Sequence, residues 1–308
     1  MRILATAFLL QVLAGPDPAQ MEKAPDLGYV PVPHSFHLPD GMTWGAPSSV
    51  ATTSTGHILI FQRGSSPLVE FDQDGKFVRA LTVEPYERPH GLRVDAQDNI
   101  WMTDVNGHTV TKMNQQGKVL LVLGTKGRAG EWNEATSSHL LNEPTDLAIG
   151  PMGDIFVVEG HGRPESRVLR FDKAGKFIKS WGGKGTGPGQ FDIAHSIVID
   201  RTGLVYVADR QNRRIQIFDT DGKFIKEWKY AGLPCGLYIT PDQQMYMLSG
   251  FAGQILKLDR EGKAVAATGQ PGKGLGEFGE AHYMSFGPHG EIYVADTINA
   301  VLHKFVKK

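Results

Sequence analysis

The chain has 308 residues, a formal net charge of −1 and 41% hydrophobic residues. A charge so close to neutral does not favour a nucleic-acid-binding protein or one that docks on anionic lipid. Cys235 is the only cysteine, so an internal disulfide is excluded and a sizeable hydrophobic core must stabilise the fold. Large all-β folds of this length commonly form one domain.

The N-terminus has the pattern of an export signal. Arg2 supplies a positive charge, an apolar run extends from Ile3 to Ala14, and residues 15–20 look like a cleavage region. The run is too short to cross a bilayer, and no cysteine stands at this site for lipid attachment. We therefore predict a signal peptide at residues 1–20, export to the periplasm or the extracellular space, and no membrane anchor.

A unit of about 40 to 50 residues recurs along the rest of the chain. Period-2 alternation, β-branched and aromatic residues, and turns with Gly or Asp indicate strands, and nothing resembles a sustained helical period. The fourth copy shows all four strand segments, at Ile197–Asp200, Val205–Asp209, Arg214–Asp219 and Phe224–Trp228. Six copies begin near Pro47, Pro89, Pro144, Ala194, Pro234 and Ala281.

Six such repeats predict an all-β fold, a six-bladed β-propeller over residues 21–308. The last copy ends with the segment Val301–Phe305, before a fourth strand. The segment Tyr29–Leu38 precedes the first copy and is expected to supply that N-terminal strand. Closing the ring in this way removes exposed sheet edges.

Histidine alternates with a small residue in the loop through which each repeat is expected to enter its first strand. In blade order these residues are Ser48, His90, Thr145, His195, Cys235 and His282. Alternate blades of a six-fold ring stand about 120° apart, so the three imidazoles are expected to converge on the axis. Three such ligands leave the fourth position of a metal ion open, and neutral imidazoles suit zinc. The alternative is three unrelated surface or capped histidines.

A second position follows the acid that ends the second strand of most blades. There the residues are Arg63, Val105, Gly160, Arg210, Gly250 and Thr297. Blades one and four lie opposite each other, so Arg63 and Arg210 are expected to face across the mouth of the channel. Two guanidinium groups beside a metal would bind a substrate carboxylate. The alternative for each is a surface salt bridge.

These residues resemble a known family. The repeat resembles the NHL type, and the axial residues resemble peptidyl-α-hydroxyglycine α-amidating lyase (peptidylamidoglycolate lyase) over about residues 45 to 306. The resemblance implies that His90, His195 and His282 bind zinc and that Arg63 and Arg210 bind substrate. The most specific segments are Phe61–Gly64, Pro89–Leu92 with Trp101–Val105, Pro144–Asp146, His195–Ser196 and Ala208–Asn212.

The implied reaction cleaves a C-terminal α-hydroxyglycine into an amide and glyoxylate, with zinc as a Lewis acid and a general base that takes the hydroxyl proton. The family's catalytic tyrosine falls on His161, which is therefore the expected catalytic residue beside Arg63 and Arg210; the alternative is that His161 is an ordinary exposed loop residue. The family's calcium contacts fall on the backbone carbonyls of Val50 and Leu92.

At the residue after the third zinc histidine, the family usually has an acid and this chain has Tyr283. Carbonyls alone bind Ca²⁺ weakly, so zinc is the expected cofactor and calcium is not. The expected partner is a small molecule or peptide with a C-terminal carboxylate, and no nucleic acid.

Two other functions remain open. The first is a non-catalytic NHL-repeat propeller that binds a peptide or protein, because one fold carries many functions. The other alternative is a metal-dependent, lactonase-like hydrolase on the same architecture. We rank it last because this axis offers histidines where many such propellers place acids and Asn around calcium.

Overall fold

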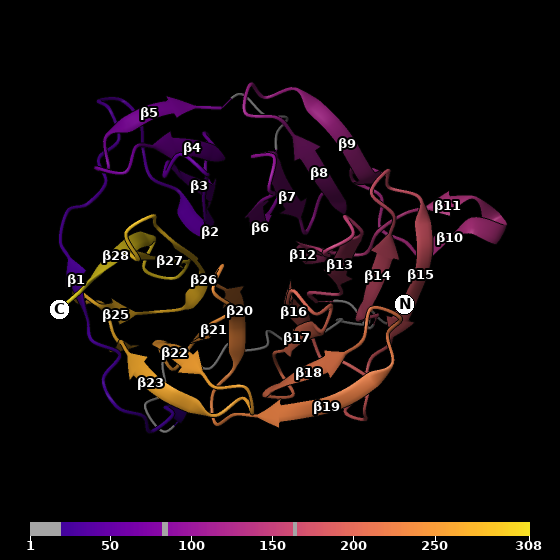
Figure 1. Ribbon diagram of the computed structural model, residues 1–308. Helices are drawn as coiled ribbons and strands as arrows, with labels where there is room; N and C mark the ends of the chain where they lie inside the picture. The colour runs from indigo at the N-terminus through magenta and orange to yellow at the C-terminus, as the bar shows by residue number, and fades with distance from the viewer. Residues whose placement is uncertain (1–19, 82–85, 163–164) are drawn as a thin grey trace, which may run out of the picture.

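The computed structural model describes residues 20–81, 86–162 and 165–308. Within them, six four-stranded sheets stand around a central axis, and the chain is a six-bladed β-propeller as the repeats predicted (Figure 1). Five of the sheets run through four consecutive strands of the chain from the axis outward. Their inner strands lie side by side around the axis and carry the functional positions.

The first three blades each contain four antiparallel strands in chain order. Blade one contains β2 (Ala46–Thr52), β3 (Ile58–Arg63), β4 (Leu68–Phe71) and β5 (Phe77–Ala80). Blade two contains β6 (Pro89–Val94), β7 (Ile100–Asp104), β8 (Thr109–Met113) and β9 (Val119–Gly124). Blade three contains β12 (Pro144–Ile149), β13 (Ile155–Glu159), β14 (Arg167–Phe171) and β15 (Phe177–Gly182).

The last three blades repeat this arrangement, with one exchange at the end. Blade four contains β16 (Ala194–Ile199), β17 (Val205–Asp209), β18 (Arg214–Phe218) and β19 (Phe224–Lys229). Blade five contains β20 (Pro234–Ile239), β21 (Met245–Ser249), β22 (Gln254–Leu258) and β23 (Ala264–Thr268). Blade six contains β26 (Ala281–Phe286), β27 (Ile292–Asp296), β28 (Val301–Lys307) and, from the other end of the chain, β1 (Tyr29–Val32).

The strand β1 closes the ring, as expected from the incomplete last repeat. It pairs antiparallel with β28, with Tyr29 opposite Lys307 and Val32 opposite Lys304. The pairing gives blade six the strand order β1-β28-β27-β26. The outer edge of β28 is therefore covered by backbone hydrogen bonds from a segment far away in sequence.

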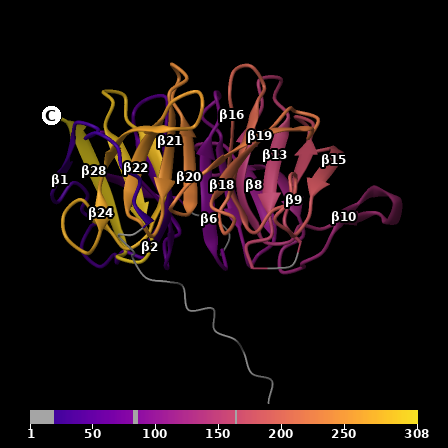
Figure 2. The same ribbon diagram turned by 90° about the horizontal axis from the view of Figure 1, so that it is seen from below.

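A few short elements lie outside the blades. A small hairpin of β10 (Trp132–Asn133) and β11 (Ser138–His139), joined by the 3-10 helix η2 (Glu134–Thr136), projects from the rim of the disc (Figure 2). The strands β24 (Gln270–Pro271) and β25 (Glu277–Phe278) form a parallel pair in the link between blades five and six. In the described part of the chain, no helix is long and apolar enough to cross a membrane.

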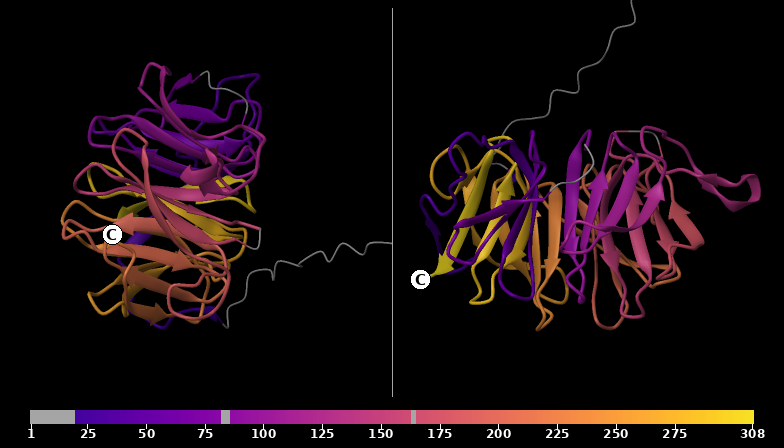
Figure 3. Two further views of the ribbon diagram at one scale, coloured as in Figure 1. Left: turned by 90° about the vertical axis from the view of Figure 1, so that its right-hand side faces the viewer. Right: turned by 90° about the horizontal axis from the view of Figure 1, so that it is seen from above.

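The core is divided among the junctions between blades. Six buried apolar clusters occur among the described residues, and each joins two neighbouring sheets. At one junction, for example, Ile215 and Ile217 of β18 belong to the same cluster as Leu256 and Leu258 of β22. Each sheet packs with both faces on neighbouring sheets, so the six blades together form a disc (Figure 3). The expected signal peptide, residues 1–20, lies almost entirely outside the described residues and stays a prediction.

Candidate metal centre

All six inner strands have an irregular register near their first residues. In β6 the pairing with β7 shifts between Pro89 and Leu92, and β16 and β26 shift at the equivalent place. The three axial histidines lie at these shifts, each as the second residue of its strand. The sequence placed them in the loop before the strand, which was wrong. A β-bulge inside the strand re-aims the side chain and is common beside functional sites.

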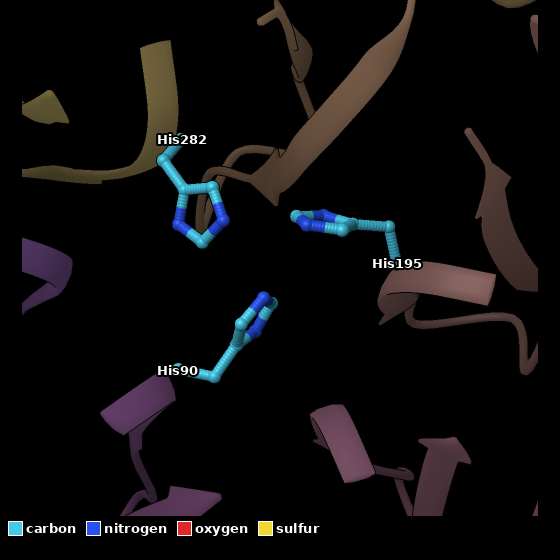
Figure 4. Close-up of side chains that lie close together, drawn as sticks. All are labelled: His90, His195 and His282. Atoms are coloured by element: carbon cyan, nitrogen blue, oxygen red, sulfur yellow. The ribbon is translucent and has the colours of Figure 1, made fainter. Parts of the chain in front are cut away.

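The bulges bring His90, His195 and His282 together, as the alternation predicted (Figure 4). One potential ligand atom of each imidazole lies within 4.8 Å of the others, and the three ring centroids are 4.7 to 4.9 Å apart. The histidines are at most 2% exposed. Three nitrogen atoms so placed from separate strands are the arrangement of a metal tripod.

The residues that alternate with the histidines orient the imidazoles. The Nδ1 atom of His90 lies 2.7 Å from the carbonyl oxygen of Thr145, the equivalent residue of the next blade. His195 makes the same contact with Cys235 at 3.0 Å, and His282 with Ser48 at 2.7 Å. Because a carbonyl only accepts, each Nδ1 carries the proton and donates. Each Nε2 therefore keeps its lone pair for another partner.

The donor set fits a divalent metal ion. Burial lowers the pKa of His90, His195 and His282 well below the usual value, and neighbouring positive groups lower it further. The imidazoles are therefore neutral, the form that binds a metal. The Nε2 atoms of His90 and His195 are buried without a hydrogen-bond partner among the described residues. Such orphaned acceptors are rare in proteins, and a bound cation would satisfy them.

Both predicted arginines lie beside the tripod. Arg210 is 3% exposed, its Nη1 lies 3.6 Å from Glu280 Oε1, and its Nε is buried with no hydrogen-bond partner in the part of the chain that the structure describes. Nε of Arg63 donates to the carbonyl of Pro89 at 3.3 Å. Burial, then the nearby Arg88 guanidinium, lowers the pKa of Arg63 to about 10. Neither arginine forms the surface salt bridge that was the alternative for it.

Arg88 and Glu280 are site residues that the sequence reasoning missed. No hydrogen bond or ion pair ties the Arg88 guanidinium to another described residue. Burial lowers its pKa, and charges on Glu143, Arg210 and Glu280 also act on it. Arg88, Glu143 and Glu280 each stand two residues before a site position in their blades. Extending the repeat comparison by two residues would have shown this charged set.

His161 lies in the loop after β13 and against the tripod. Its ring centroid is 4.9 Å from that of His90 and 5.7 Å from that of His195. Burial, followed by His90 and Arg210, lowers the pKa of His161 well below its usual value. The imidazole is therefore neutral and able to accept a proton. The structure therefore places this sequence-predicted residue in the site.

The two positions expected to contact calcium lie in inner strands, two residues after the site position of each strand. Val50 and Leu92 are buried in inner strands β2 and β6. Tyr283, at the position of the family's acid, is also buried, and its hydroxyl donates to the carbonyl of His195 at 2.7 Å. A phenol that donates to a carbonyl replaces the carboxylate that would help bind Ca²⁺.

Comparison with known proteins agrees with this fold. A family model described as a 6-bladed beta-propeller matches residues 134–254. NHL repeat-containing protein 3 of Mus musculus is 34% identical over 180 residues, which are 55% of this chain and 51% of that protein. The chain is an NHL-repeat six-bladed β-propeller.

Homologues of the chain include amidating lyases. A probable peptidyl-alpha-hydroxyglycine alpha-amidating lyase of Caenorhabditis elegans is 30% identical over 197 residues, covering 55% of this chain and 54% of that protein. A peptidyl-glycine alpha-amidating monooxygenase of Mus musculus is 34% identical over 219 residues, covering 58% of this chain but 22% of that protein. The chain thus spans about half the length of the NHL-repeat relatives that it matches.

Solved structures show the same architecture at low sequence identity. A structure described as streptogramin B lyase has a TM-score of 0.60 and 15% identity, covering 91% of this chain and 98% of that one. A gluconolactonase of Xanthomonas campestris has a TM-score of 0.63 and 16% identity, covering 87% and 88%. At this identity the likeness concerns the fold alone.

Proposed function

We propose that the protein is an exported, zinc-dependent carbon–nitrogen lyase that cleaves an α-hydroxyglycine amide into an amide and glyoxylate. The observation that carries this proposal is the tripod of neutral, buried imidazoles, with Arg63 and Arg210 beside it. Homologues named as amidating lyases support the type of reaction. The apolar N-terminal segment supports export.

The tripod supplies the place for zinc, through the Nε2 atoms of His90, His195 and His282. Bound there, zinc would supply Lewis acidity toward an oxygen of the substrate. The Nδ1 contacts with backbone carbonyls hold all three rings in the ligating tautomer.

The arginines serve to bind and orient the substrate carboxylate. Among the described residues, nothing hydrogen-bonds the buried Nε of Arg210, and the ion pair of Arg210 with Glu280 is long at 3.6 Å. Within the same residues, the Arg63 guanidinium makes one hydrogen bond, to a backbone carbonyl. Both guanidinium groups therefore keep donors for a carboxylate, which they can bind through paired hydrogen bonds. Fixing that group places the carbinol carbon relative to the tripod.

His161 serves as the proton acceptor. Its neutral imidazole takes the proton of the carbinol hydroxyl, and the hydroxyl oxygen becomes the aldehyde oxygen of glyoxylate. The C–N bond breaks as that C=O bond forms, and its electron pair goes to the amide nitrogen. The nitrogen then takes up a proton, so the hydroxyl proton is conserved in the amide product.

The test is a substrate panel with α-hydroxyhippurate and a set of lactones. We expect equal amounts of glyoxylate and benzamide from α-hydroxyhippurate. The variant Arg210→Gln should lower kcat/KM by about 10²-fold, whereas the exposed Arg213→Gln should leave it unchanged. Metal-loaded protein that opens lactones, or that acts on nothing and only binds peptides, would overturn the lyase proposal and leave the metal site standing.

A further inference from the structure

A guanidinium group crosses the axis just beyond the tripod. Arg93 of β6 forms an ion pair with Asp146 of β12, and its Nε donates to Oδ1 of Asp146 at 3.0 Å. The same group donates to Ser196 Oγ at 3.2 Å and to the carbonyls of Ile197 and Leu237 at 3.5 and 3.4 Å. One side chain thus connects four inner strands, β6, β12, β16 and β20.

The carboxylate that holds Arg93 is itself fully buried. Asp146 accepts hydrogen bonds from Ser196 Oγ at 2.7 Å, from the amide of Ile197 at 3.1 Å and from the amide of Leu147 at 2.9 Å. Burial of Arg93 works against its charged form, but the Asp146 carboxylate outweighs it and raises the pKa of Arg93. The axis therefore carries a permanent cation at this level.

Tyr283 lies between this cation and the tripod. The Arg93 guanidinium carbon is 5.5 Å from the centroid of the phenol ring, a cation–π distance. The Tyr283 hydroxyl donates to the carbonyl of His195 at 2.7 Å and to that of Thr145 at 3.3 Å. The Thr145 carbonyl also accepts from His90 Nδ1. Tyr283 is thus linked to the carbonyl that orients the His90 imidazole and to the backbone of His195 itself.

This arrangement disagrees with the calcium ion that the family resemblance implies. The expected calcium contacts, the carbonyls of Val50 and Leu92, belong to residues two places after the site position in their strands. Ile197 and Leu237 hold the same place in their own strands, and their carbonyls accept hydrogen bonds from the guanidinium. Two carbonyls of this level therefore bind a guanidinium group, and Tyr283 stands where the family has an acid, so the level does not fit Ca²⁺.

We propose that Arg93 is the resident cation of the axis, that it replaces calcium, and that it is a positioning residue for the tripod. The Arg93 guanidinium and the Asp146 carboxylate form an ion pair with no net charge, so this level of the axis is occupied without a metal ion. The replacement of calcium holds whatever reaction is catalysed, whereas the positioning role rests on zinc binding at the tripod.

Calcium dependence tests the replacement. Purified wild-type protein should contain no stoichiometric calcium, and neither EGTA nor added Ca²⁺ should shift its Tm. The double variant Arg93→Ala/Tyr283→Asp frees the carbonyls of Ile197 and Leu237 and the Asp146 carboxylate and restores an acid after His282, so Ca²⁺ should raise its Tm and EGTA should reverse the shift. Wild-type protein that holds calcium, or loses Tm in EGTA, would overturn the replacement even if no variant folds.

Metal affinity tests the positioning role. The variant Arg93→Lys keeps the charge but loses the planar fork, so it should bind zinc about 10-fold more weakly. It should also alter the visible spectrum of Co²⁺ bound at the tripod. The control Arg213→Lys changes an exposed arginine and should match wild type in both. Equal zinc affinity and equal Co²⁺ spectra for the two variants would refute the positioning role without bearing on glyoxylate release.

Discussion

His161 is the residue at which the chemistry of this site departs from that of the amidating lyases it resembles. An imidazole stands where the family has a tyrosine, and its ring lies 4.9 Å from that of His90. Because burial keeps the imidazole neutral, it accepts a proton near neutral pH, whereas a free phenol is fully protonated there. In the proposed mechanism, the exchange therefore changes the group that takes the substrate proton, while the three histidines stay the same.

Replacing His161 by Ala should lower kcat for glyoxylate release by about 10² to 10⁴-fold. Zinc content should be unchanged, because His161 is not one of the three converging ligands. Activity assays with metal analysis of the same sample check both points. His161→Tyr, which restores the family's residue, is the matched control and should keep more activity than His161→Ala. Full activity in His161→Ala would exclude its role as the base.

Cys235 should be inert in the folded protein. Burial raises the pKa of its thiol to about 12 from an ordinary value near 9.0, so at about pH 8 no reactive thiolate forms. A coloured thiol reagent should label the unfolded chain completely and the native chain hardly at all. Since the folded pKa is the higher one, this thiol stabilises the fold below about pH 9 and loses that contribution as pH rises toward 12. Rapid native labelling would contradict this.

At the scale of elements, the sequence predicted the strands well and their irregularities poorly. The alternation of apolar residues located the repeats, and the inner strands begin within one residue of the six positions where the copies were expected to begin. The first strand of the fourth copy was expected only from Ile197, whereas β16 begins three residues earlier, at Ala194. The bulges could not be predicted, because they depend on how the backbones of two strands pair. The pattern of residues along one strand does not show this pairing. Placing His90 in a loop was the result. The role of Arg93 could not be predicted for the same reason. In the sequence it is an ordinary strand residue, and its partners lie on other blades.

Gly75 should be essential to the contact between blade one and the segment after β1. It lies in the turn between β4 and β5 with φ +83°, and an added Cβ would come 1.8 Å from the backbone oxygen of Ser35. Gly41 has a similar φ of +84° with open space around it. Gly41→Ala should cost about 1 kcal/mol from backbone strain alone, and Gly75→Ala more than about 3 kcal/mol. Equal free energies of unfolding in urea would contradict the clash.

At the scale of the whole molecule, closure of the ring is what makes the site. The ligands His90, His195 and His282 span most of the chain, and they converge because six blades divide one turn. The repeat count and the alternation made this convergence predictable. Contacts between repeats were harder to foresee. Arg88 and Glu280 each stand two residues before a site position, so the repeat could have located them, but their electrostatic interaction depends on how the blades are placed in space.

The closing strand should therefore contribute to the stability of the entire propeller. Tyr29 of β1 is buried, and its hydroxyl donates to the carbonyl of Gly290 at 2.9 Å. Tyr29→Ala should lower the free energy of unfolding by about 3 kcal/mol. Its neighbour Val30 is 38% exposed, so Val30→Ala should change it by less than about 0.5 kcal/mol. Urea titrations of both variants check this, and a neutral Tyr29→Ala would show that β1 is dispensable.

The metal content of protein purified without chelator tests the metal centre most directly. The convergence of His90, His195 and His282 predicts about one zinc per chain by elemental analysis. The variant His195→Ala should lose this zinc while keeping the fold, whereas replacing the exposed His139 should leave zinc unchanged. Wild-type protein that binds no zinc even after incubation with it, or a His195→Ala variant that keeps a full equivalent, would contradict the metal centre.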